Sequence, residues 1–233
     1  MHCFVDYRTT TEELNNLIKL NLEPIIIPKT SSVYKAIDGH VDIQLNIVDY
    51  KKRIVIIQKN IDKNFIDQLV AKNINYIFSK EPLGNNYPND IILNGLVLDN
   101  HFIHNINYTD ENFLETQKDK TIIHVNQGYT KCSVLPIRNN ALITNDSGIY
   151  DSLYNSTFDV LLLPPGDILL PSLNYGFIGG TGGMISNNKL GLFGELQHYI
   201  HGEAIYDFLY KYDVEPISLK KGKLIDRGSL FCI

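Results

Sequence analysis

The chain has 233 residues and a formal net charge of −5; 44% of its residues are hydrophobic and 20% are charged. This length can bury a substantial core, and the acidic balance, with no basic block, excludes a surface built for nucleic acid or an anionic membrane. Apolar runs such as residues 160–163 are too short to span a membrane, and the N-terminus has no basic segment followed by an apolar stretch. We therefore expect a cytoplasmic protein that acts on a small-molecule substrate, with no nucleic-acid or membrane partner; the oligomeric state is not predicted.

The cysteines and histidines argue against a metal centre. None of the three cysteines belongs to a CxxC pair, which suits a reducing compartment, and the seven histidines show no HExxH spacing. We predict no metal and no cofactor.

Helical and strand patterns alternate along the whole chain. The first helix is expected over about residues 10–20, where Thr9 with Glu12, or Thr10 with Glu13, fits a capping box. The other expected elements are strands at 3–5, 24–28, 39–45 and 53–57, a helix around 65–70, strands at 76–78, 87–93 and one ending near 104, a weak helix at 113–114, strands at 121–125, 133–137 and 141–144, a helix at 149–153, strands at 160–163 and 190–193, a helix at 205–212, a strand at 215–219 and a final segment at 224–233.

The same order of helix, strand and strand pair recurs five times, at a spacing of roughly 40 residues. The approximate repeats are 1–58, 59–105, 106–145, 146–194 and 195–233. One such unit cannot bury its own apolar faces, so the repeats favour a single domain in which five α/β units close into a ring around a central cleft. An ordinary α/β sandwich whose regular alternation imitates a repeat is the alternative.

Three segments align without gaps and carry polar residues at the same place: residues 42–45 (DIQL), 90–93 (DIIL) and 132–135 (CSVL). Equivalent strands of a ring would bring Asp42, Asp90 and Cys132 to equivalent positions around the axis. A cysteine entering a buried strand straight after the Gly128 turn can present a reactive thiolate at the strand mouth. It can equally be a small apolar core residue, and the residues alone leave both interpretations open.

A fivefold ring of ββαβ units with a central cysteine resembles the pentein superfamily, the guanidino-group-modifying enzymes. Residues 128–133 (GYTKCS) are similar to the Gly-Gly-x-x-Cys-x-Ser/Thr motif of that family, with Tyr129 in place of the second glycine. Residues 40–42 (HVD) resemble its His-x-Asp motif, residues 226–230 (DRGSL) partly resemble Glu-Gly-Gly-Asp-Val, and residues 6–9 (DYRT) resemble Ser-x-Arg-Thr. The resemblance implies a five-bladed α/β propeller.

The motifs stand in a permuted order, because the acidic-glycine motif ends this chain although it comes first in the family. This order indicates a circular permutation with the new termini in a hairpin between residues 230–232 and 3–5. A closed ring of similar units has no privileged starting point, and hairpin tips tolerate new termini. We therefore predict that residues 3 and 232 lie on adjacent antiparallel strands.

The resemblance also implies roles for individual residues. Cys132 would attack the carbon of an amidine, guanidine or amide-like C–N group, and His40 would protonate the departing amine and then activate water. Asp42 would orient His40 or pair with a cationic substrate, and Asp226 would hold a guanidinium. His40 and Asp42 at a strand start, or Asp226 as a solvated turn carboxylate, are the structural alternatives.

Several departures from the family pattern weaken that assignment. Ser229 stands where the family has an aspartate, and residues 174–177 (NYGF), with Tyr175, stand where it supplies another substrate-binding acid. Asn89 and Asp90 could replace the missing acid, or could form only a turn. The glycine-rich run 176–183 lacks a phosphate-loop pattern and is expected to be a close backbone approach near the axis or a flexible rim. A pentein-like protein that binds a metabolite or protein partner without catalysis remains the second hypothesis.

Overall fold

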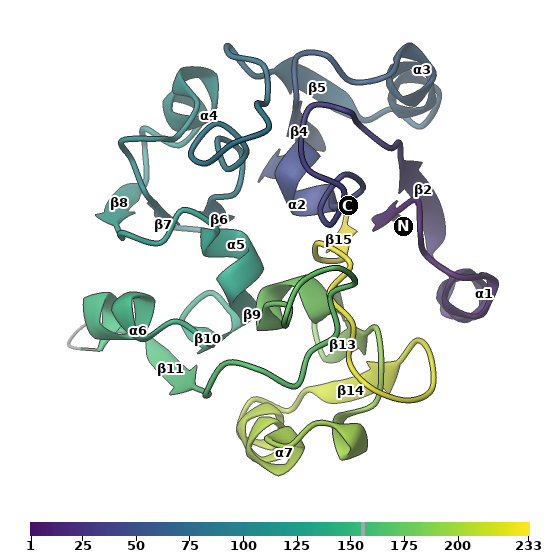
Figure 1. Ribbon diagram of the computed structural model, residues 1–233, viewed down its shortest axis with the longest axis vertical. Helices are drawn as coiled ribbons and strands as arrows, with labels where there is room; N and C mark the ends of the chain where they lie inside the picture. Colours follow the sequence, from purple (N-terminus) through teal and green to yellow (C-terminus); the bar gives the residue numbers. More distant parts are fainter. Residues whose placement is uncertain (155–156) are drawn as a thin grey trace.

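Five three-stranded sheets surround a central axis in the computed structural model, which describes residues 1–154 and 157–233 (Figure 1). In each sheet the middle strand pairs antiparallel with one neighbour and parallel with the other. The sheets are β15 (Phe231–Cys232), β1 (His2–Asp6) and β2 (Glu23–Ile27); β3 (Leu45–Asp49), β4 (Ile54–Ile57) and β5 (Asn75–Phe78); β6 (Leu96–Val97), β7 (His101–His104) and β8 (Thr121–His124); β9 (Val134–Arg138), β10 (Ala141–Thr144) and β11 (Asp159–Leu162); and β12 (Gly182–Ser186), β13 (Lys189–Leu192) and β14 (Glu215–Ser218).

One helix connects the parallel strands of each sheet and lies on the outside of the ring (Figure 1). These helices are α1 (Thr11–Lys19), α3 (Lys63–Ala71), α4 (Glu111–Thr116), α6 (Ser147–Leu153) and α7 (Gly202–Lys211). Each unit is therefore ββαβ, and the fold is the five-bladed α/β propeller that the repeats predicted. The capping box of α1 forms between Thr10 and Glu13, the second of the two expected pairs.

The apolar core lies between neighbouring sheets. One cluster combines Phe4 and Ile25 of the first sheet with Leu45, Val55 and Phe65 of the next unit. The aromatic rings of Phe4 and Phe65 lie 6.2 Å apart, centre to centre. The inner strands are almost wholly buried, whereas outer strands such as β5 and β14 are half exposed. Each sheet thus depends on its two neighbours to cover its faces.

The two ends of the chain close the ring. Cys3 and Phe4 of β1 are the register partners of Cys232 and Phe231 of β15. His2 and Ile233 exchange two backbone hydrogen bonds of 2.9 and 2.8 Å. The predicted antiparallel pairing of the termini is confirmed, and one sheet is completed by strands from opposite ends of the sequence.

Three local expectations need correction. Val41–Gln44 and Thr130–Ser133 form the one-turn helices α2 and α5, so Asp42 and Cys132 precede their strands instead of lying in them. Residues 87–93 are not the expected strand, because residues 87–90 and 92–93 form turns and β6 begins only at Leu96. Gly95 lets the chain pack closely against the Phe102 ring, since a Cβ there would lie 2.5 Å from it. The gap-free alignment of 90–93 with 42–45 therefore fails.

The sheets also divide the chain at different points from the expected repeats. The boundaries at 58, 105, 145 and 194 each fall between the second and third strands of a sheet. In the part of the chain that the structure describes, each helix is too short or too polar to cross a membrane.

Candidate active site

The two one-turn helices bring the predicted catalytic residues together at the axis. α2 and α5 each precede the innermost strand of a sheet, and all their residues are buried. Donor atoms of His40, Asp42 and Cys132 lie within 4.8 Å of one another. His40 and Cys132 lie on the floor of a cavity of about 270 Å³, which we call the front pocket. Its other lining residues are Tyr34, Ile37, Tyr129, Leu170, Leu173, Asn174, Tyr175, Phe177 and Asp226.

Cys132 is held by Asn94 from the neighbouring sheet. The Asn94 side-chain amide donates to Cys132 Sγ at 3.1 Å, and its oxygen accepts the backbone N–H of Cys132 at 3.1 Å. Burial raises the pKa of the Cys132 thiol well above its usual value, and the charges of Asp42 and Asp226 raise it further. The thiol is consequently neutral in the free protein, contrary to the low pKa expected of a resting thiolate.

His40 is buried and open to a new partner. Among the described residues, neither of its ring nitrogens has a hydrogen-bond partner; Nδ1 lies 3.8 Å from Asp226 Oδ1. Burial lowers the pKa of His40, an effect that the charge of Asp42 opposes. The imidazole is therefore neutral near pH 7 and cannot depress the pKa of Cys132 in the free protein. Gly228, at φ 69°, leaves room for the ring, because a Cβ there would lie 2.3 Å from His40 Cβ.

Two buried carboxylates flank the histidine. Asp226 accepts the backbone N–H groups of Phe177 and Gly228, both at 2.9 Å. Burial nevertheless raises the pKa of Asp226 to about 6. Asp42 Oδ2 accepts from the Ser229 hydroxyl at 2.6 Å, while Asp42 Oδ1 lacks a partner among the described residues. Asp226 lines the front pocket and can accept hydrogen bonds from a cation there, whereas Asp42 is not a lining residue and can act on such a cation through its charge.

The donors of His40, Asp42 and Cys132 are of the types that zinc binds. A thiol binds zinc as the thiolate, so a zinc ion at this place would displace the Cys132 proton. The same three side chains can also transfer protons and donate or accept hydrogen bonds, and the function proposed below uses them in that way.

The remaining predicted residues have mixed positions. Tyr175 lines the front pocket, half exposed at its rim. Asp90 is buried behind the pocket wall, where it accepts the Tyr129 hydroxyl at 2.6 Å. Asn89 is exposed and lies outside the pocket lining. Gly128 has a packing role, because its carbonyl accepts from His104 Nε2 at 3.0 Å and a Cβ there would lie 2.7 Å from Tyr87.

Asn94 occupies the place by the axis that the alignment assigned to Asp90. The Asn-Gly sequence at 94–95, before the apolar residues 96–97, was the one available signal for it. Tyr34 and Phe177, which form aromatic walls of the pocket, were not predicted because they belong to no recognisable motif. The glycine-rich run is the predicted close approach: a Cβ at Gly180 would lie 1.8 Å from Asp226 Oδ1.

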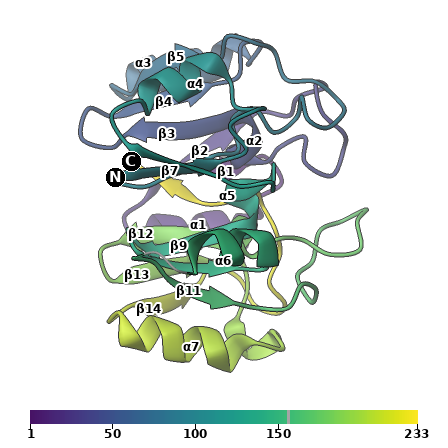
Figure 2. The ribbon, with the colours of Figure 1, turned by 90° about the vertical axis from the view of Figure 1, so that its left-hand side faces the viewer.

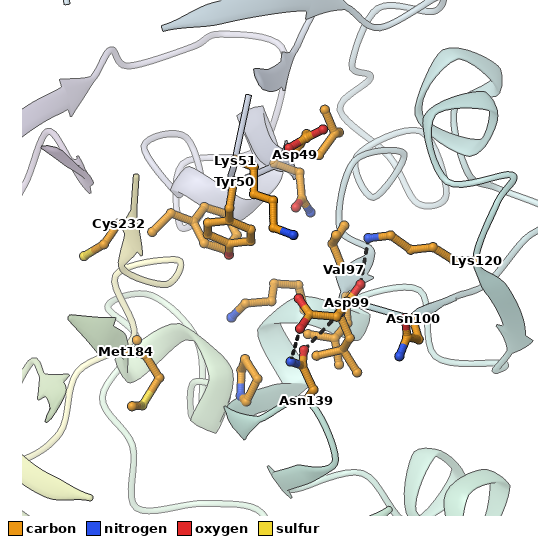
Figure 3. Close-up of a pocket in the computed structure, with 18 of the residues that line it drawn as sticks. Asp49, Tyr50, Lys51, Val97, Asp99, Asn100, Lys120, Asn139, Met184 and Cys232 are labelled. Carbon is orange, nitrogen blue, oxygen red and sulfur yellow. Dashed lines mark hydrogen bonds between the residues drawn. The ribbon is translucent and has the colours of Figure 1, made fainter. Parts of the chain in front are cut away.

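A second, larger cavity opens on the other face of the ring (Figure 3). This rear cavity, of about 870 Å³, is lined by residues from the hairpin turns, including residues 48–52, 96–100 and 136–139, and by Cys232 near the chain ends. In Figure 2 the chain ends lie at the left and the front helices α2 and α5 lie farther right. The rear cavity also touches Lys131, whereas the next residue, Cys132, lines the front pocket.

Comparison with known proteins supports the fold. The model of a family of unknown function (DUF6873) matches residues 4–231, and no curated protein matches the sequence. Among solved structures, the chain is similar to SxtG, an amidinotransferase of the saxitoxin biosynthetic pathway from Microseira wollei (TM-score 0.53, 8% identity, 97% of this chain and 89% of that one). It is also similar to the inosamine-phosphate amidinotransferase StrB1 from Streptomyces griseus (0.57, 11%, 94% and 77%) and to DDAH from Pseudomonas aeruginosa, a cysteine-to-serine mutant complexed with citrulline (0.51, 10%, 94% and 92%). These proteins belong to the pentein superfamily, so the chain has a pentein fold.

Proposed function

We propose that this chain, which belongs to the family of unknown function DUF6873, is a cysteine-dependent hydrolase or transferase. Its substrate would be a small molecule with an amidine, guanidine or amide-like C–N bond, and residues 1–233 would act as one pentein-like domain. The observation that carries the proposal is the convergence of Cys132, His40 and Asp226 in the lining of an apolar-walled pocket, with Asp42 close to His40 and Cys132. The amidinotransferases and DDAH with a similar fold support the substrate class.

The charges of the pocket favour a cationic substrate. Asp42 and Asp226 are buried acceptors with oxygens near His40, and the rings of Tyr129 and Phe177, which line the pocket with Asp226, stack at 6.2 Å. A planar cation could lie against these rings while donating to Asp226. Its positive charge would offset both carboxylates and lower the pKa of Cys132, so the thiolate would form when the substrate binds.

The reaction would then proceed in two halves. The Cys132 thiol gives its proton to His40, and Sγ bonds to the central carbon of the substrate. The C–N bond to the leaving amine breaks as His40 returns the proton to that nitrogen. In the second half water, or an acceptor amine in a transferase, attacks the carbon with His40 as the base. The C–S bond breaks and Cys132 recovers its proton.

A pulse experiment tests this proposal. The protein is mixed with a panel of small amidines and guanidines, quenched in acid, and digested for mass spectrometry. We expect a covalent adduct on the peptide that contains Cys132 and none on those that contain Cys3 or Cys232. Absence of any adduct, with no release of amine, would contradict an enzyme of this class.

The raised pKa of Cys132 favours one second candidate, a pentein-like protein that binds a small cation without reacting with it. A chloroacetamidine, which carries both a cationic amidine and an alkylating carbon, separates the two. If the chain is an enzyme, chloroacetamidine should label Cys132 faster than neutral chloroacetamide does, after each rate is divided by the rate of the same reagent with a free thiol. A binding protein should show reversible protection of Cys132 without such acceleration.

A further inference from the structure

A buried lysine lies directly behind the candidate nucleophile. Lys131 is 4% exposed, and its ammonium donates to the Ser229 hydroxyl at 2.8 Å and to the carbonyls of Gly179 and Val134 at 3.3 and 3.4 Å. These three acceptors use all three of its N–H groups. Lys131 lines the rear cavity and does not line the front pocket, so its ammonium does not compete with a cationic substrate there.

Ser229 connects this lysine to the carboxylate under His40. Its hydroxyl accepts from Lys131 and can donate to Asp42 Oδ2 at 2.6 Å or to the Gly179 carbonyl at 2.9 Å. The residue has φ 71°, a left-handed conformation that residues other than glycine rarely adopt. Two consecutive hydrogen bonds therefore join Lys131 to Asp42 through a serine held in an unusual backbone conformation.

The surrounding charges show why Asp42 needs this partner. Asp42 is fully buried, and burial raises its pKa, as does the nearby Asp226, whereas His40, Lys131 and the hydroxyl of Ser229 lower it. Burial also lowers the pKa of Lys131, an effect that the charges of Asp42, Cys132 and Asp226 oppose. Asp42 also faces His40 and Cys132, which are neutral groups in the free protein. The other charges near His40 are Asp6, Arg8 and Asp38, and Arg8 is already bound to Asp6. In the part of the chain that the structure describes, Lys131 is the cation that hydrogen bonds connect to Asp42, through the hydroxyl of Ser229.

We propose that Lys131 is a positioning residue that acts through Ser229 to favour the charged form of Asp42 and to orient its carboxylate beside His40. This assignment rests on the proposed function for its catalytic meaning. The ionised Asp42 would stabilise the imidazolium that forms when His40 takes the thiol proton. The lysine thus acts two hydrogen bonds away from the residue that faces His40.

The direct test is the titration of Asp42, followed by NMR of protein labelled with ¹³C at the aspartate carboxyl carbon. The Asp42 resonance is assigned from the spectrum of Asp42→Asn. We expect Lys131→Met to raise the Asp42 midpoint by about one pH unit or more. Ser229→Ala should also raise it and should move the Asp226 midpoint less, because the Ser229 hydroxyl is hydrogen-bonded to Asp42, Lys131 and Gly179.

The double variant shows whether the lysine acts through the serine. If it does, Lys131→Met combined with Ser229→Ala should raise the Asp42 midpoint by less than the sum of the two single shifts. Additive shifts, or an unchanged Asp42 midpoint in folded Lys131→Met, would overturn the proposal. This readout uses no substrate, so it stays independent of whether the chain turns over an amidine.

If Lys131→Met fails to fold, a double variant that removes both charges still tests the proposal. Lys131→Met leaves Asp42 buried without its cation, whereas Asp42→Asn with Lys131→Met leaves no charge in that pair. If Lys131→Met alone unfolds and the double variant folds, the pairing is supported. Loss of folding in both would mean that Lys131 supports the ring for another reason, which overturns the proposal.

Discussion

The two faces of the ring axis carry cavities of opposite character. The front pocket is small, has mainly apolar walls, and places buried titratable groups on its floor. The rear cavity is larger, and two of its charged lining residues are already bound by neighbours: Lys120 donates to the Leu98 carbonyl at 2.7 Å, and the Asp99 carboxylate accepts from Asn139. The size of a cavity alone therefore does not identify the candidate site. Burial of polar groups with unused hydrogen-bonding capacity is the better indicator of chemistry.

The same substitution made in both cavities tests most directly whether only the front pocket is catalytic. Cys132→Ser should lower kcat/KM by a factor of about 10³ or more, because a serine hydroxyl at this place has no equivalent nucleophilicity. Cys232→Ser, in the rear cavity, should change kcat/KM by less than about twofold. Steady-state kinetics on the substrate found by the adduct screen measures both. Equal losses would end the distinction between the faces.

The histidine provides the next largest effect. His40→Asn should lower kcat/KM by about 10²–10⁴-fold, the usual contribution of a proton-transferring side chain. The matched control is His198→Asn, because His198 is half exposed, its side chain pairs with Glu195 at 3.3 Å, and it does not line the front pocket. Circular dichroism verifies that both variants fold. A His40→Asn protein with wild-type kinetics would remove His40 from the mechanism.

The rear face should respond to oxidation without affecting the front. Cys3 and Cys232 are register partners beside the hydrogen-bonded pair His2 and Ile233, so they form the close, non-hydrogen-bonded kind of pair. Such pairs have Cα atoms about 4.5 Å apart, within the range of a disulfide. Oxidised glutathione should link them by two exchange steps, releasing two reduced glutathiones.

The link would join the two ends of the ring and raise the free energy of unfolding by about 2–4 kcal/mol. Denaturant unfolding with and without reductant measures the gain, and Cys3→Ser is the control that cannot form the bond. The front-pocket kinetics should stay unchanged. A stable glutathione adduct on Cys232 with no link to Cys3 would contradict the predicted geometry.

The smallest expected effect is a pH dependence that belongs to Asp226. Its pKa is raised to about 6, so below pH 6 the side chain becomes protonated and loses the charge that attracts a cation. kcat/KM should then fall by about tenfold per pH unit below 6. Asp226→Asn should lack this acidic limb and have the lower activity throughout; a retained limb would assign it to another group.

Stability should move in the opposite direction to activity. The folded protein takes up the Asp226 proton at a higher pH than an ordinary aspartate with pKa 3.8 does. This group therefore makes the protein more stable as the pH falls from about 6 towards 4. Thermal unfolding of the wild type and Asp226→Asn at pH 5 and pH 7 isolates the contribution, because all other groups are shared.

The sequence could predict the ring and the convergence of its main residues, but not their ionisation. Helix and strand periodicity predicted most elements, and short motif resemblances identified Cys132, His40, Asp42 and Asp226. Asn94 was missed because an apolar pattern placed the aligned strand three residues too early. Lys131 looked unremarkable beside a cysteine, since its partner Ser229 lies 98 residues away. The directions of the pKa shifts depend on burial that only the assembled ring creates.

The sheet closed by β15 and β1 also has a consequence for how the protein is made. β1 and the segment with His40 leave the ribosome well before Asp226, Gly228 and β15, since Asp42 and Ser229 are 187 residues apart in the sequence. The contacts between them have very large sequence separations, and such contacts form slowly because long chain segments must first be brought together. A nascent chain can assemble the middle sheets, but it lacks the carboxylate beside His40 and the serine beside Lys131. The candidate site is therefore completed in the same late step that closes the ring, which leaves truncated chains without it.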